Sequence, residues 1–462
     1  MVEAAAEHAD LFERLTSWEN LLRAARQARR GKRRQPDVAA FELERERELL
    51  HLQDQLRHGT YRPGPYRAFW VREPKRRLIS AAPYRDRVVH HALVNLIGPL
   101  FERNFVTDSY ANQVGKGTHR AVDRYQHFAR RFRFVMQFDI VKFFPSLDHE
   151  ILKHQLRSRV RDERVVGLCD AIIDASNPQE QIVHYFRGDD LFTPAERRRG
   201  LPIGNLTSQF WANVYLHGLD NFVKRGLRCA GYVRYVDDFV LFADNKAELR
   251  ARRAAVVKFL ERLRLRIHER RAQPRPTTRP TRFLGYRCWP THRYLTKENI
   301  RRFRRRGRAL QRGYARWELD WADVRARLAS WNAHAATASC RALRWRLLSS
   351  LSFQRGPVEV PVSCVAGRGT ATQPTAVARI ATGTGQPTAT TTSGFVLRRG
   401  VSARAGAGMP AITIAGSAPR ESEPDSGSRS RRGRGECTLW SRSAHAVIAP
   451  AGTFVEPRHL AF

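Results

Sequence analysis

The stretch from residue 232 to residue 243 constrains the fold of this chain most strongly. It reads YVRYVDDFVLFA, so two apolar runs rich in β-branched and aromatic residues flank the adjacent acids Asp237 and Asp238. Runs of this composition favour β-strands, and a short polar break between them indicates a hairpin. A hairpin turn can hold a carboxylate over the face of a sheet where strand alternation alone would not. The stretch therefore predicts a β-hairpin with a pair of acids at its tip.

A third acid, Asp139, ends the apolar strand pattern of residues 134–138. If that strand lies beside the hairpin, Asp139 meets Asp237 and Asp238, and three carboxylates at one point repel unless cations lie between them. Hard oxygen ligands of this kind favour Mg²⁺. Two such ions about 4 Å apart would stabilise the attacking 3′-hydroxyl and the leaving pyrophosphate of an in-line transfer. A bare Asp-Asp pair usually makes only a turn, and the flanking strands are what favour the catalytic interpretation.

The charge balance points to a polyanionic partner. Lys and Arg number 82 against 44 acidic residues, a net charge of +38, which predicts nucleic acid first and an anionic membrane surface second. No apolar run is long enough to span a bilayer, and the Ala-rich start is unlike a signal peptide. The six cysteines form no CxxC pair, so neither a zinc site nor a disulfide framework is expected, and a cytoplasmic setting fits best.

Helical and strand patterns alternate up to about residue 355, and the character of the chain then changes. Helical periodicity covers residues 10–58, with a break at Pro36, and returns at 85–101, 206–223, 248–265 and 297–350. A basic hairpin is expected at 67–80 and short strands at 132–140 and 283–289. Residues 356–462 are rich in Gly, Ala, Thr, Ser, Pro and Arg without sustained periodicity, so a disordered tail is predicted.

Four motifs in order resemble the motif set of reverse transcriptases. They are FDIVKFF at 138–144, GLPIGNLTSQ at 200–209, YVDD at 235–238 and FLG at 283–285, and the resemblance covers roughly residues 60–345. It implies an α+β, right-hand polymerase, with fingers and a ferredoxin-like antiparallel palm over 59–290. An N-terminal helical segment at 1–58 would precede them, and a helical thumb at 291–355 would follow.

The same resemblance implies roles for matched residues in the active site. Asp139, Asp237 and Asp238 would be the catalytic ligands of two Mg²⁺ ions, with Mn²⁺ as the alternative metal, and the backbone of Ile140 would join them. Phe144 would be the aromatic gate that excludes a 2′-hydroxyl, with Phe143 as the alternative.

The fingers segment supplies four candidate cations for the triphosphate of the incoming dNTP. Arg and Lys suit charge-assisted contacts to phosphate, although template contact or a solvated face is an equal alternative for each. The four are Lys75, Arg77, Arg85 and Arg87.

The second motif departs from that of mobile-intron enzymes, which usually read PQGxxxSP at this place. Here Ile203 replaces the usual Gln and Gln209 the usual Pro, a form that resembles reverse transcriptases of diversity-generating retroelements. In that family the replaced Gln lies beside the incoming nucleotide, so Ile203 and Gln209 belong to the predicted dNTP site. Losing the amide removes a positioning hydrogen bond, and the resemblance implies errors opposite template adenines.

The tail supplies a second indication. Residues 362–396, back-translated with one permitted codon for each residue and read in another frame, give an Asn-rich peptide. That peptide resembles the C-terminal repeat of the C-type-lectin-like proteins these elements diversify. The tail is therefore interpreted as an out-of-frame reading of the template repeat, with a basic nucleic-acid-binding extension as the alternative.

The resemblance also implies partners: the RNA template and its RNA/cDNA duplex, dNTPs, and a small basic accessory protein that forms a pentameric barrel. Two other functions stay open from the sequence. One is a retron-like or defence-associated reverse transcriptase, and the other is a catalytically inactive RNA-binding protein on a polymerase scaffold. The tryptophans of the predicted thumb, Trp317, Trp321, Trp331 and Trp345, are expected to pack between helices.

Overall fold

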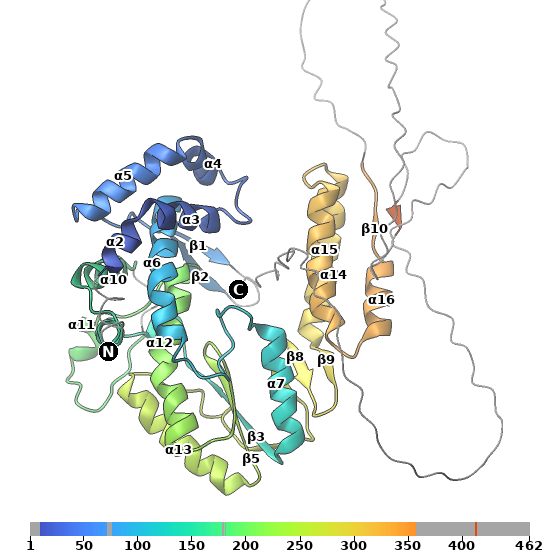
Figure 1. The fold of residues 1–462 in the computed structure, drawn as a ribbon. Coiled ribbons are helices and arrows are strands. Elements are labelled where there is room, and N and C mark those ends of the chain that lie inside the picture. Colours follow the sequence, from blue (N-terminus) through green and yellow to red (C-terminus); the bar gives the residue numbers. More distant parts are fainter. Residues whose placement is uncertain (1–9, 72–75, 178–179, 181, 357–411, 414–462) are drawn as a thin grey trace, which may run out of the picture. The chain divides into compact units, whose positions relative to one another are not determined.

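The computed structural model describes residues 10–71, 76–177, 180, 182–356 and 412–413 (Figure 1). The described chain forms two compact units, one up to Tyr294 and one from Leu295 onward. Helices and short strands are mixed, so the α+β expectation is confirmed. Beyond Gly356, the predicted tail lies outside the described residues except at 412–413.

The first unit contains helices whose starts follow ordinary capping rules. Pro36, the predicted break, is the first residue of a helix, where its missing N–H costs nothing. Asp148, Asp162 and Asn245 each accept a backbone N–H of the first turn. The helices are α2 (Leu11–Thr16), α3 (Trp18–Ala28), α4 (Pro36–Leu43), α5 (Arg45–Arg57), α6 (Tyr84–Glu102), α7 (Thr118–Arg131), α8 (Phe143–Ser146), α9 (His149–Arg157), α10 (Glu163–Asp174), α11 (Thr193–Glu196), α12 (Leu206–Asn221), the π-helical turn η1 (Phe222–Gly226) and α13 (Lys246–Arg262).

A four-stranded antiparallel sheet lies among these helices. Its strands are β3 (Phe134–Asp139), β4 (Gly231–Tyr235), β5 (Asp238–Ala243) and β6 (Arg275–Pro276), in the order β4-β5-β3-β6. The expected hairpin is β4–β5, and the expected strand before Asp139 is β3, next to β5. Both strand predictions are confirmed.

Both faces of this sheet are buried, which explains the nearly continuous apolar runs. On one face, Phe138 and Phe239 stack with ring centroids 4.7 Å apart inside the large core that α6 and α12 complete. On the other, Phe242 packs against Tyr125 of α7, with centroids 5.2 Å apart. Successive strand residues point to opposite faces, so each run fills two cores. This double burial makes the sheet a rigid base for the residues at its ends.

Two smaller β-elements complete the first unit. The expected basic hairpin is formed by β1 (Arg67–Val71) and β2 (Arg77–Ala81). It contacts the loop at residues 200–205, where Ser80 N donates to Ile203 O at 3.1 Å. The second element contains β7 (Thr281–Phe283), β8 (Tyr286–Cys288) and β9 (Arg293–Leu295). Its β7–β8 turn has positive φ at Leu284 and Gly285, within the FLG motif.

The second unit is helical, with α14 (Lys297–Ala315), α15 (Trp321–Ala336) and α16 (Arg341–Ser349), followed by β10 (Ser352–Phe353), which pairs with β11 (Ile412–Thr413). Trp331 stacks on Phe303 of α14 at 3.6 Å, and Trp321 packs edge-on against Tyr314 of α14, as expected for helix packing. For Trp317 and Trp345 that expectation was wrong, because their exposures are 47% and 37%. No helix in the described part of the chain has the length and apolarity to cross a membrane.

Candidate active site

The tip of the β4–β5 hairpin is a two-residue turn made by Val236 and Asp237, closed by the pair Tyr235 and Asp238. Val236 has φ +56°, a left-handed conformation that β-branched residues rarely adopt. The turn places Asp237 at the end of the sheet and starts β5 at Asp238.

The sheet brings two of the three predicted acids together. Asp139, the last residue of β3, pairs in register with Asp238, the first residue of β5. Residues opposed in this way have Cα atoms about 4.5–5.5 Å apart. Asp237 precedes Asp238, so all three acids lie at one end of the sheet, as the sequence predicted.

Asp238 has an unusual environment for a carboxylate. Burial raises its pKa to about 8; a hydrogen bond from Gln137 Nε2, at 2.8 Å, opposes the rise, and repulsion from Asp237 and Asp139 adds to it. Gln137 was missed at the sequence level, although strand alternation places it on the same face as Asp139, two residues on. The raised pKa therefore reflects mainly the cost of holding a charged carboxylate at a buried position.

Asp139 is held by the loop that follows α13. Its carboxylate pairs with the guanidinium of Arg271 and lies 3.9 Å from His268 Nε2, while its backbone carbonyl accepts the His268 N–H at 2.9 Å. Arg271 also went unnoticed, and no local pattern marks it, because it lies 132 residues away along the chain.

These acids fit a hard divalent cation by their chemistry. They offer carboxylate oxygens, the ligands Mg²⁺ prefers, from three neighbouring residues at one end of the sheet. Within the described residues no three acidic, His or Cys side chains converge as a finished metal cluster. Arg271 and Gln137 hold the carboxylates of Asp139 and Asp238 instead. A bound cation would replace the positive charge of Arg271 beside Asp139 and the hydrogen bond that Gln137 donates to Asp238.

We expect the metal-free protein to lose stability as pH rises from about 4 to about 8. Asp238 ionises near 3.8 when unfolded but near 8 when folded. Over this interval the folded state holds the additional proton, so raising the pH favours unfolding. Urea unfolding in chelator across the interval measures the effect, and Asp238→Asn should remove this component. Parallel profiles for the two proteins would contradict the assignment.

The remaining predicted residues of the nucleotide site lie on two neighbouring segments. Ile140 is buried beside Asp139, and Phe144 on α8 is more exposed than the core residue Phe143. The carbonyl of Phe144 accepts the Leu201 N–H at 3.0 Å, so α8 adjoins the loop of the second motif. In that motif Ile203 and Gln209 are both half-buried.

The four candidate cations for the triphosphate differ in the contacts that their side chains already make. Arg87 Nε donates to Ala82 O at 2.8 Å, which ties it to its own backbone. Arg85 lies over the Tyr61 ring, and its Nε and Nη2 are buried without a hydrogen-bond partner in the described part of the chain. Arg77 is half-buried on β2, and Lys75 lies outside the described residues.

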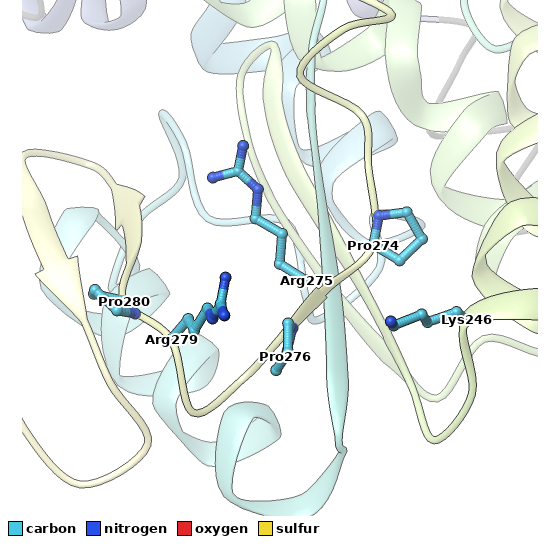
Figure 2. A pocket seen from close by; sticks show the side chains of 6 residues that line it. All are labelled: Lys246, Pro274, Arg275, Pro276, Arg279 and Pro280. Atoms are coloured by element: carbon cyan, nitrogen blue, oxygen red, sulfur yellow. The ribbon is translucent and has the colours of Figure 1, made fainter.

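The opposite end of the sheet carries an open hollow of about 610 Å³, here called the basic hollow. Figure 2 shows its lining: Lys246, Arg275 and Arg279 with the prolines Pro274, Pro276 and Pro280. The three cations are exposed and form no ion pair within the described part of the chain. Asp139 and Phe134 end the same strand, so about 17 Å separates the hollow from the acids.

Comparisons with known proteins agree with the motifs. The sequence model of the family described as "Reverse transcriptase (RNA-dependent DNA polymerase)" matches residues 72–288. Protein YkfC of Escherichia coli is 27% identical over 280 residues, covering 52% of this chain and 71% of YkfC. The group II intron-encoded protein LtrA of Lactococcus lactis is 23% identical over 181 residues, covering 38% of this chain and 28% of LtrA.

Other similarities span smaller shares. The mitochondrial nuclear intron maturase 1 of Arabidopsis thaliana is 24% identical over 151 residues, covering 28% of this chain and 21% of the maturase. The chain thus spans less than a third of LtrA and of this maturase. Among solved structures, the apo telomerase of Candida tropicalis aligns with TM-score 0.38 and 9% identity, covering 50% of this chain and 48% of the telomerase chain.

Proposed function

We propose, on the premise that this chain belongs to the reverse transcriptase family and is an RNA-directed DNA polymerase, that it makes error-prone cDNA from a template-repeat RNA of a diversity-generating retroelement. The polymerase activity rests on the three acids at one end of the sheet. The error-prone character rests on one observation, the aliphatic Ile203 and the accompanying Gln209 in the second motif.

For the chemistry, Asp139, Asp237 and Asp238 would hold two Mg²⁺ ions, or Mn²⁺ in their place, with the backbone of Ile140 beside them. When bound, the ions stabilise the attacking and leaving oxygens of the nucleotidyl transfer. The protein's part is to keep the carboxylates on a sheet that is buried on both faces. Phe144, the more exposed aromatic of its pair, serves as the gate against a 2′-hydroxyl.

Among the fingers cations, Arg85 is the strongest candidate for the triphosphate. Its Nε and Nη2 are buried and have no hydrogen-bond partner among the described residues, whereas Arg87 already donates to a backbone carbonyl. An unsatisfied buried donor is costly, and a phosphate oxygen would satisfy it. Arg77 and Lys75 stay predictions.

Sequencing of cDNA tests the proposed function directly. The protein, supplied with a primed RNA of known sequence and dNTPs, should misincorporate mainly opposite template adenines. Errors no more frequent opposite adenine than opposite the other three template bases would refute adenine-directed misincorporation and leave the polymerase activity standing. The small basic accessory protein is an optional component of this assay, whose addition should raise cDNA yield if it is a partner.

Ile203→Gln should reduce misincorporation opposite template adenines about three- to tenfold, since a restored hydrogen bond contributes roughly 0.5–1.5 kcal/mol to base selection. Ile203 lies on the loop that β2 contacts through Ser80, so the added amide stays close to the fingers hairpin. Error spectra of the variant and of the matched control Ile203→Leu give the measurement. Equal error rates in both variants would exclude Ile203 as the determinant.

The basic hollow should bind the phosphate backbone of RNA. Replacing Lys246, Arg275 and Arg279 together by Gln should weaken RNA binding and lower the slope of log affinity against log salt by about 1 for each phosphate that is no longer neutralised. Titration of labelled RNA at several salt concentrations measures the slope. A control triple, the exposed Arg26, Arg30 and Arg57 changed to Gln, removes equal charge elsewhere. An equal loss of affinity in both triples would contradict a site at the hollow.

A further inference from the structure

A fully buried ion pair lies next to the turn that Val236 and Asp237 form between β4 and β5. Arg234 of β4 and Asp220 of α12 are both 0% exposed. Two parallel hydrogen bonds join them, from Nε to Oδ1 and from Nη2 to Oδ2, each 2.6 Å long. Tyr232 donates to the same Oδ1 at 2.6 Å, so both oxygens of the carboxylate accept hydrogen bonds. The two parallel hydrogen bonds between Arg234 and Asp220 fix the orientation of the guanidinium.

The remaining nitrogen of Arg234 reaches the turn itself. Nη1 donates to Asn213 Oδ1 at 3.2 Å and to the carbonyl of Val236 at 3.1 Å. Val236 is the residue with φ +56°, and it directly precedes Asp237. A guanidinium has its donors in a fixed planar fork, so orienting two nitrogens on Asp220 also orients the third on Val236.

The backbone of Arg234 is held as firmly as its side chain. Its N–H donates to Asp108 O at 2.9 Å, and its carbonyl accepts from Tyr110 N at 3.0 Å. At this residue β4 is therefore paired on both sides, with residues 108–110 on one side and with β5 on the other. The Arg234 guanidinium is a side-chain link between the strained turn and this rigid frame.

Stability alone is a weak reason for such a pair. The cost of removing both charges from water commonly cancels their attraction, and apolar replacements of similar volume are often as stable. What an apolar replacement would lack is the hydrogen bond to Val236. A β-branched residue in a left-handed turn persists only when its surroundings over-determine it.

We propose that Arg234, oriented by Asp220 and Asn213, is a positioning residue that holds the turn at Val236 so that Asp237 and Asp238 present their carboxylates to the metal. This inference rests on the polymerase activity and is independent of the error-prone character. The role of the buried ion pair is then to fix the position of the acids that hold the metal.

The decisive comparison is Arg234→Lys against Tyr232→Phe. Lys keeps the charge beside Asp220, but a single ammonium cannot also serve Asn213 and Val236. Tyr232→Phe removes a hydrogen bond from the same buried carboxylate and leaves the link to the turn intact. Both variants lose stability, and only the first loosens the turn.

Two readouts separate positioning from stability. In Arg234→Lys, kcat for nucleotide addition and the affinity for Mn²⁺ measured without substrate should each fall about tenfold, the size of one missing hydrogen bond to a charged group. The KM for the RNA template should stay within about twofold of wild type. Tyr232→Phe should keep kcat and Mn²⁺ affinity within about twofold at a similar loss in Tm.

If Arg234→Lys fails to fold, the paired variant Arg234→Gln with Asp220→Asn takes its place, because it leaves no lone buried charge and Gln is too short to reach Val236. Unchanged kcat and Mn²⁺ affinity in the folded Arg234 variant would overturn the proposal, as would equal losses in Tyr232→Phe. Wild-type cDNA synthesis without adenine-directed errors would count against the error-prone function alone.

Discussion

Asp237→Asn is expected to lower Mg²⁺-dependent cDNA synthesis about a thousandfold or more and to leave RNA binding within about twofold of wild type, since a metal-held transition state loses several kcal/mol without its carboxylate. Asp237 lies in the turn between β4 and β5, beside Asp238 and on the same sheet end as Asp139. The amide keeps the size of the side chain and removes its charge. Primer extension on an RNA template and an RNA-binding titration measure the two quantities.

Asp244→Asn is the matched control for this experiment. Asp244 follows the other end of β5, is exposed, and accepts only the Arg133 N–H at 3.2 Å among the contacts of the described residues. Its replacement should leave synthesis within about twofold of wild type, because surface changes away from a site have small effects. Synthesis that survives Asp237→Asn would refute the metal assignment. A loss of RNA binding together with synthesis would indicate a folding defect instead.

The second large effect is on stability. Asp220→Ala should destabilise the protein by about 3–5 kcal/mol, since removing one partner leaves the other charge buried and unpaired. The stranded group is Arg234, which is 0% exposed and has its main counter-charge in Asp220. Urea unfolding followed by tryptophan fluorescence measures the change, with buried Trp211 on the same helix as a reporter.

An exposed contact between an acid and a histidine provides the comparison for Asp220→Ala. Asp54 of α5 lies 3.1 Å from His58, the residue that caps the end of this helix, and both side chains are more than 60% exposed. Asp54→Ala should change stability by at most about 0.5 kcal/mol. A cost for Asp220→Ala no larger than that of Asp54→Ala would mean that Arg234 finds another partner or water after the substitution. The buried pair would then contribute no more to stability than a surface contact.

Local sequence patterns predicted much of the fold. The apolar runs around the two adjacent acids predicted β4 and β5, because aromatic and β-branched residues fit a pleated, buried surface. Asp139 could be paired with them only by supposing that β3 lies next to β5, and the register Asp139 with Asp238 bears this out. Pro36 was predicted as a break in the helical run, and the structure makes it the first residue of α4, where its fixed φ is suited.

Other residues of the site carry no local signal. Arg271 meets Asp139 across 132 residues of sequence, and Arg234 meets Asp220 only because α12 packs behind β4. In the sequence Arg234 is one more cation in a chain with 82 Lys and Arg residues. Trp317 shows that a local pattern can also mislead. Its helical spacing suggests burial, whereas the side chain is exposed and Arg355 lies over its ring.

The sequence by itself determined the chemistry available to this protein: two adjacent acids in a hairpin, a third at a strand end, and an aliphatic residue at position 203. These features are local, since strand alternation and turn composition depend on neighbours a few residues apart. The tertiary structure alone decided which charges compensate the acids, which cation stands behind the turn and where the basic hollow lies. Those properties depend on burial and on contacts between distant segments, and burial is what makes each charge costly to leave unpaired.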